Sequence, residues 1–171
     1  MTRPSREKAA QIVQDAGGRI VGRTRMQKIA FLLEITGLGE GFHFEYKHFG
    51  PYSDELADAM KMACAFRLIS VEDHETNWGG WYSVYCSAAS ARVGLAERNI
   101  LASEAAKFDP VELELAATAA FIAAVERSDD PWGETERRKP EKATVARLQR
   151  AKAVYRHLAG LKVPKPLPAI A

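Results

Sequence analysis

Apolar residues recur along residues 23–68 with two different periods, and the change of period predicts the elements of this central region. Over residues 26–36 they lie three or four positions apart, as on one face of an α-helix. Thr24 is the expected N-cap of this helix, and Gly37 is suited to end it in the left-handed conformation. The pattern therefore predicts an amphipathic helix that begins near Thr24.

The aromatic residues that follow have a period of two. Phe42, Phe44 and Tyr46 alternate with polar residues, which indicates a half-buried strand. The Gly-Pro pair at residues 50–51 is expected to end this strand, because proline has no N–H group to donate and its φ angle is fixed.

Another helix is predicted to start after Ser53, since a serine N-cap followed by acidic residues suits the positive end of the helix dipole. Strand-like runs then begin at Ile69 and resume at Trp81, and residues 77–80 between them favour a β-hairpin. With a first helix over Ser5–Asp15, the order is helix, helix, helix, hairpin. This is the order of a winged helix-turn-helix, and the short strand between the second and third helices is expected to complete its sheet.

The expected fold class is therefore mainly α with a small β-hairpin or sheet, a winged helix-turn-helix-like core with additional C-terminal helices. We place the core at residues 1–93 and a C-terminal helical extension, packed on it, at residues 94–161. An Asp-Pro pair at residues 109–110 predicts the start of one helix of this extension. Three prolines in residues 162–171 predict a flexible tail.

The net charge of +2 does not indicate a class of partner, but the charged residues are unevenly distributed along the chain. Residues 1–50 carry eight Lys or Arg against five Asp or Glu, whereas residues 51–110 carry five against nine. If DNA is bound, phosphate contacts are expected from the basic front. The candidate nucleic-acid-binding residues are Arg19, Arg23, Arg25, Lys28, Lys47 and His48.

The acidic middle favours a protein partner instead. A helix that enters the major groove should offer cations to phosphate, whereas the predicted third helix begins with carboxylates. Exposed tryptophan is a common anchor at protein interfaces. The candidate partner-binding residues are Tyr52, Asp54, Glu55, Asp58 and Trp78. Two structural alternatives stay open: the basic face is only solvated charge, and Trp81 packs into the core while Trp78 is simply exposed.

Catalytic and metal-binding motifs do not stand out. The sequence has no HExxH, paired CxxC, GxSxG or P-loop pattern, and its four histidines lack ligand spacing. Cys64 and Cys86 lie inside apolar runs. We therefore expect both to be buried free thiols in a reducing compartment. No apolar run approaches the roughly 18 to 20 residues that span a bilayer. We expect a cytoplasmic protein without enzymatic activity, metal or cofactor.

Two short motifs carry a resemblance to known bacterial proteins. MQK at residues 26–28 and FGPYS at residues 49–53, followed by Glu55-Leu56, are spaced as in the YwgA-like family and, more distantly, in the Panacea (SocA-like) domain of antitoxins. The resemblance extends weakly to LELAATAAFI and RRKPEKAT in the C-terminal half. It implies a compact, mostly helical, winged-helix-like domain without established catalytic residues, and, from the Panacea proteins, a toxin-like partner.

Together, the residues and the resemblance predict a non-enzymatic binding or regulatory protein. An antitoxin-like module that binds a protein partner is placed slightly ahead of the alternative, a DNA-binding transcriptional regulator that contacts phosphates through its basic N-terminal face. The sequence leaves open whether the chain forms a homodimer.

Overall fold

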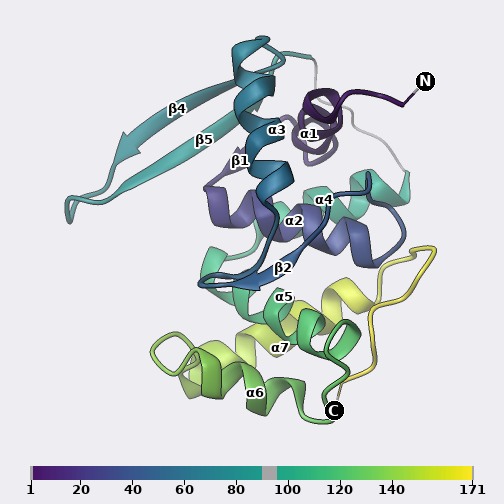
Figure 1. The fold of residues 1–171 in the computed structure, drawn as a ribbon. Helices are drawn as coiled ribbons and strands as arrows, with labels where there is room; N and C mark the ends of the chain where they lie inside the picture. The colour runs from purple at the N-terminus through teal and green to yellow at the C-terminus, as the bar shows by residue number, and fades with distance from the viewer. Residues whose placement is uncertain (1, 90–95, 171) are drawn as a thin grey trace.

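The computed structural model describes residues 2–89 and 96–170, which form seven helices and five short strands (Figure 1). The helices are α1 (Ser5–Asp15), α2 (Arg23–Ile35), α3 (Asp54–Ala65), α4 (Glu97–Lys107), α5 (Pro110–Ala124), α6 (Pro131–Arg138) and α7 (Val145–Ala159). The strands are β1 (Arg19–Val21), β2 (Glu45–Lys47), β3 (Gly50–Tyr52), β4 (Ile69–Glu75) and β5 (Trp81–Ser87). The prediction of a mainly α fold with a small sheet is confirmed.

One antiparallel sheet has the strand order β1-β5-β4. Its third strand is β1, from the segment between α1 and α2, where Ile20 pairs with Tyr85. The prediction that a strand between the second and third helices completes this sheet is therefore wrong. The reason is that β1 is only three residues long, too short to show a period of two in the sequence.

The strands between α2 and α3 instead form a hairpin of their own, in which β2 pairs with β3 and Tyr46 lies opposite Pro51. Gly50 and Pro51 were expected to end a strand, but they belong to β3. A two-stranded hairpin tolerates proline because every strand in it has a free edge, so the missing N–H leaves no partner unpaired. The chain reverses direction at His48 and Phe49.

The N-caps predicted at Ser53 and Asp109 are confirmed, whereas the one predicted at Thr24 is wrong. The Ser53 hydroxyl accepts a hydrogen bond from the Leu56 amide, and the Asp109 carboxylate accepts from the first amides of α5, as predicted. The Asp130 carboxylate likewise caps α6. Thr24, however, is not an N-cap, because α2 already begins at Arg23 after Gly22.

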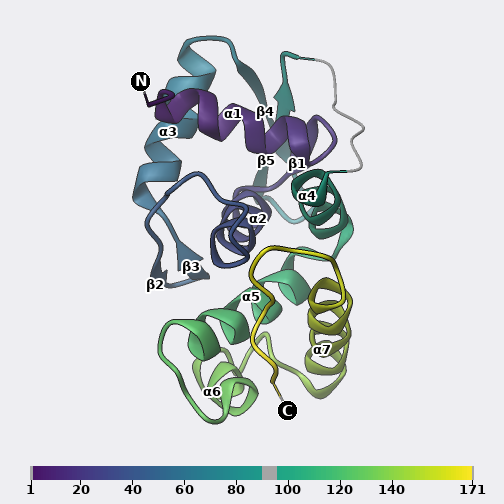
Figure 2. The ribbon, with the colours of Figure 1, turned by 90° about the vertical axis from the view of Figure 1, so that its right-hand side faces the viewer.

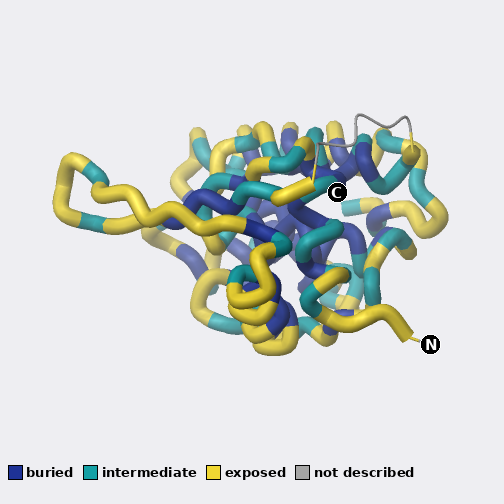
Figure 3. Tube along the Cα trace, turned by 90° about the horizontal axis from the view of Figure 1, so that it is seen from above, coloured by how far each residue is buried: buried dark blue, intermediate teal, exposed yellow. Residues whose placement is uncertain are grey.

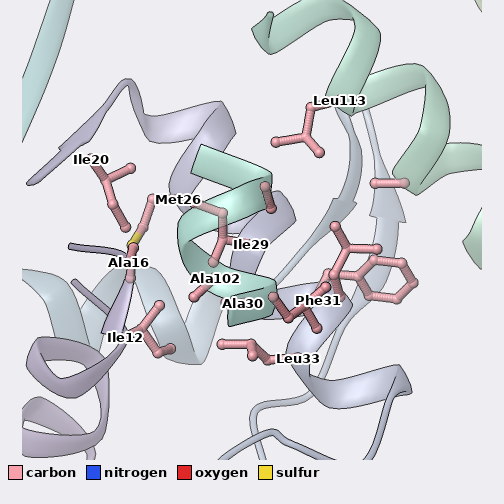
Figure 4. Close-up of a cluster of buried hydrophobic side chains, with 14 of the residues drawn as sticks. Ile12, Ala16, Ile20, Met26, Ile29, Ala30, Phe31, Leu33, Ala102 and Leu113 are labelled. Carbon is pink, nitrogen blue, oxygen red and sulfur yellow. The ribbon is translucent and has the colours of Figure 1, made fainter. Parts of the chain in front are cut away.

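The hydrophobic core centres on α2, which is surrounded by α1, α4, α5 and the two sheets. Figure 4 shows side chains from several of these elements meeting around Met26, Ile29 and Phe31 of α2. Eight consecutive residues of α2, from Met26 to Leu33, are buried. A helix buried all round has no face on which an exposed charge can lie, which matters for Lys28 below.

Helices α5, α6 and α7 form the lower half of the molecule, and α5 packs directly against α2 and β3 (Figure 2). The boundary predicted after residue 93 lies outside the described residues. The last segment, for which three prolines predict a loose tail, packs on the body: Leu167 is buried and the Lys165 amide donates to the carbonyl of Thr36 at 2.9 Å. Within the described ranges, no helix is long and apolar enough to cross a membrane.

Candidate functional site

The two motifs of the central region meet inside the molecule. The Gln27 side chain forms a pair of hydrogen bonds with the backbone of Ser53, donating to its carbonyl at 3.0 Å and accepting from its amide at 2.9 Å. The neighbouring Lys28 ammonium donates to the carbonyl of Pro51 at 2.7 Å. Side chains of α2 thus satisfy backbone groups of β3 and of the start of α3 that would otherwise be buried without partners.

Charged groups from the C-terminal half close this polar cluster. Glu114 of α5 is buried and accepts from the Lys139 ammonium at 2.7 Å and from the Lys142 ammonium at 2.9 Å. We call the group formed by Gln27, Lys28, Ser53, Glu114 and Lys139 the buried polar joint, since it connects α2, β3 and α3 with α5 and the end of α6. Its members are all less than a tenth exposed.

Burial sets the charge state of Lys28. The pKa of the Lys28 ammonium is lowered to about 7: desolvation is the main cause, Glu114 opposes the shift, and the nearby Lys139 and Lys142 cations add to it. The three lysines outnumber the one carboxylate. The joint therefore makes protonation of Lys28 less favourable than it is in water.

Glycine at position 50 is required by the same packing. Gly50 has a φ angle of +85°, and a Cβ atom there would lie 2.6 Å from the Thr118 hydroxyl oxygen of α5. Thr118 is itself fully buried. The glycine of the FGPYS motif thus allows β3 to approach α5 closely.

The predicted nucleic-acid surface is largely dispersed. Lys28 does not contact phosphate, as its side chain is fully buried, so that prediction is wrong. The Arg25 guanidinium is half-buried and donates to the carbonyls of Phe108, at 2.9 Å, and Val21. Lys47 pairs with Asp54 at 2.6 Å and lies over the Tyr52 ring. Arg19, Arg23 and His48 remain exposed, but on three separate elements.

The acidic residues proposed for partner binding do lie on the surface. Asp54, Glu55 and Asp58 are exposed along the first half of α3, and Tyr52 directly before them is half-buried. Asp54 is paired with Lys47 and Asp58 approaches Lys61 at 3.8 Å. Ion pairs this exposed contribute little to stability, so these carboxylates remain available to another molecule.

The β4–β5 hairpin projects away from the body, and nearly all of its outer length is exposed (Figures 1 and 3). Trp78 at the tip is 85% exposed and Trp81 is 69% exposed. The alternative in which Trp81 packs into the core is therefore wrong. The hairpin extends past the helices, so Trp81 borders an open cleft and is not enclosed by the core.

A cleft of about 720 Å³ lies between the hairpin and the start of α2, and we call it the hairpin cleft. Its walls include Trp78, Trp81 and Asp73 from the hairpin and Arg23 from α2. Asp73 accepts a hydrogen bond from the Ser83 hydroxyl at 2.6 Å, which fixes the carboxylate on the cleft side of the sheet. The Trp78-Gly-Gly-Trp81 tip is visible in the sequence as a candidate docking surface, whereas the cleft between this tip and the start of α2 is not, because its walls come from segments about fifty residues apart.

Comparison of the chain with protein-family models, with curated proteins and with solved structures finds no match. Candidate functions therefore depend on the geometry of the chain itself.

Proposed function

We propose that the chain is a winged-helix binding protein that recognises a partner protein through the β4–β5 hairpin and the exposed side of α3. The order α1, β1, α2, α3, β4, β5, with β1 paired to β5, supports the winged-helix assignment. In that arrangement the β4–β5 hairpin is the wing and α3 is the third helix of the core.

The observation that carries the proposal is the exposure of two tryptophans on a projecting hairpin. Burying a tryptophan at an interface removes a large apolar surface from water, and tryptophan is enriched among residues that dominate binding energy. Trp78 and Trp81 contribute nothing to the core, so their burial is left to another molecule.

Charge indicates the kind of partner. The hairpin carries three carboxylates, Glu72, Asp73 and Glu75, and no lysine or arginine. Glu75 lies opposite Trp81 in the register, so a carboxylate and an indole face the same side. This pairing suits a lysine or arginine of a partner, through both ion pairing and a cation–π contact. We therefore assign a basic protein surface as the partner, as in an antitoxin that binds a basic toxin.

The test is affinity capture from the native cell with three baits: wild type, Trp78→Ala/Trp81→Ala, and Val145→Ala. Val145 is also an exposed apolar residue, but it lies on α7. A basic protein retained by wild type and Val145→Ala and lost from the double variant is expected. Retention of the same proteins by all three baits would refute hairpin docking. Asp73→Lys/Glu75→Lys should abolish capture of the same protein, and unchanged capture would reject the charge argument.

DNA binding is the second candidate, and the winged-helix order is the observation that favours it. Because the wing is acidic, phosphate contacts would have to come from Arg19 and Arg23. Retention of the protein on random duplex DNA across a salt series tests this directly. DNA binding requires an affinity that falls with salt and weakens in Arg19→Ala/Arg23→Ala; retention absent even at low salt would eliminate it.

A further inference from the structure

A second cleft, of about 690 Å³, opens beside the hairpin cleft and lies between α2, α3 and the root of the β4–β5 hairpin. We call it the α2–α3 cleft. Its inner wall is apolar and buried: Met26 is 2% exposed, Met60 6% and Tyr85 8%. Phe49 and Tyr52, from the β2–β3 hairpin and its end, add aromatic surface. The volume falls in the range of small-molecule sites, roughly 300 to 1,000 Å³.

The charges around this cleft have one sign. The cations Arg23 and Lys61 line it, and no aspartate or glutamate is among its lining residues in the described part of the chain. Lys28 also borders the cleft, but its side chain is buried and bound to the Pro51 carbonyl. Arg23 lies close enough to Tyr85 to lower the pKa of the Tyr85 hydroxyl, against the larger effect of burial, so the cation borders the apolar inner wall. Lys61 is held only by a loose, exposed pair with Asp58, so its ammonium is free to turn toward a ligand.

Other groups in the lining are polar but neutral, namely Thr24 and Gln27. The Gln27 amide is already engaged with the Ser53 backbone, so it does not need a ligand. The site thus combines an apolar bed with cations at its edge. Such a lining is complementary to a molecule that has an apolar body and a negatively charged end.

We propose that the α2–α3 cleft binds a small organic anion of this kind, an aromatic or branched aliphatic carboxylate, with its carboxylate at Arg23 and Lys61 and its apolar body against Met26, Met60 and Tyr85. This ligand site goes beyond partner binding by the hairpin tip. Trp78 and Trp81 line the hairpin cleft and not the α2–α3 cleft, so the two activities can be tested separately.

The chain contains its own reporter of occupancy. Cys64 of α3 lines the α2–α3 cleft, whereas Cys86 does not. Cys86 pairs with Ser70 in the sheet, one register position from the Val71–Tyr85 pair that faces the cleft. Successive side chains of a strand point to opposite faces, so Cys86 lies on the other face. Both thiols are free and partly exposed, and Cys86 is therefore an internal control.

The experiment measures iodoacetamide labelling of each cysteine by mass spectrometry, with and without naphthalene-2-carboxylate, and with neutral 2-naphthalenemethanol as the matched probe. We expect the carboxylate to slow labelling of Cys64 at least fivefold and to leave Cys86 unchanged, with a much weaker effect from the alcohol. Absence of protection at millimolar carboxylate, equal slowing of both cysteines, or equal protection by the alcohol would each overturn the proposal.

Affinity measured by calorimetry completes the test. Arg23→Gln and Lys61→Gln should each weaken carboxylate binding, the first by about tenfold because a hydrogen bond to a charged group is lost. Arg19→Gln, an exposed arginine outside the cleft, should bind as wild type does. Wild-type affinity in both cleft variants would refute the assigned orientation. Trp78→Ala should retain carboxylate binding, so failure of hairpin docking leaves this result unaffected.

Discussion

The buried polar joint and the β4–β5 hairpin place their conspicuous residues in opposite environments, buried in the joint and exposed on the hairpin. The joint contains the recognisable MQK and FGPYS motifs, and there polar side chains are enclosed and satisfied by one another. The hairpin has no recognisable motif, yet it exposes two tryptophans and three carboxylates. In this chain, the residues of the distinctive motifs are therefore needed to pack the elements together. The exposed surface that is left for binding carries no such motif.

This contrast predicts that substitutions in the joint change stability and that substitutions on the hairpin do not. The strongest expected effect is that of Glu114→Gln, which leaves the buried Lys139 cation without its compensating carboxylate. We expect a loss of about 3 to 5 kcal/mol in the free energy of unfolding, measured by urea denaturation.

The matched control for that substitution is Glu112→Gln on the same helix. Glu112 pairs with Arg150, whose side chain is largely exposed, so its loss should cost less than about 1 kcal/mol. Similar costs for both substitutions would show that the joint is not a special electrostatic site.

Gly50→Ala is expected to follow, with a loss of about 2 to 3 kcal/mol. The new methyl group meets the Thr118 hydroxyl and the backbone retains a positive φ angle. Gly41→Ala is the control: Gly41 has a φ angle of +91°, but within the described residues no neighbouring heavy atom lies within 4 Å of the added Cβ, so it should show only the conformational cost. Thermal unfolding that ranks the two equally would contradict close approach at Gly50.

Lys28 predicts a smaller, pH-dependent effect. Between its folded pKa of about 7 and its higher pKa in the unfolded chain, the unfolded state binds the proton that the folded state has lost. Stability should therefore rise with pH, by about 1 to 2 kcal/mol between pH 7 and pH 8.5. Lys28→Met should remove this rise, whereas Lys61→Met, at an exposed lysine, should keep it. A rise of equal size in Lys28→Met would mean that another group is responsible.

The smallest effect on stability is expected on the hairpin. Trp78→Ala should change the free energy of unfolding by no more than about 0.5 kcal/mol, because the side chain is exposed. Circular dichroism melts of the variant and of wild type should overlap. A marked loss of stability would show that the tryptophan belongs to the folded core and not to a binding surface.

The sequence predicts an element correctly where its formation depends on interactions between neighbouring residues. The first helix over Ser5–Asp15, the Ser53 cap and the Asp109-Pro110 start depend on a few neighbouring residues, and each was predicted where it occurs. The hairpin between Ile69 and Ser87 was likewise predicted from alternating runs around a turn. Capping and turn preferences act over three or four residues, so no distant partner is needed to read them.

Residues whose environment depends on distant segments were assigned less well. The sequence predicts a surface cation at Lys28, since nothing near it in the chain indicates that α5 and the end of α6 enclose it. Arg25 and Glu34 on the same helix make Lys28 look like an ordinary amphipathic position, and Glu114 lies more than eighty residues away in the chain.

The sequence alone thus determined several of the helices, the β4–β5 hairpin and the mainly α class, because periodicity and capping are properties of adjacent residues. The tertiary structure alone decided which strand completes the sheet, which charges are buried and which tryptophans are exposed. Those outcomes depend on how far each element extends over its neighbours: the middle of α2, from Met26 to Leu33, is buried, and the outer part of the hairpin extends beyond the body. Burial is a property of the assembled layers, and the same residue types serve as core or as binding surface according to it.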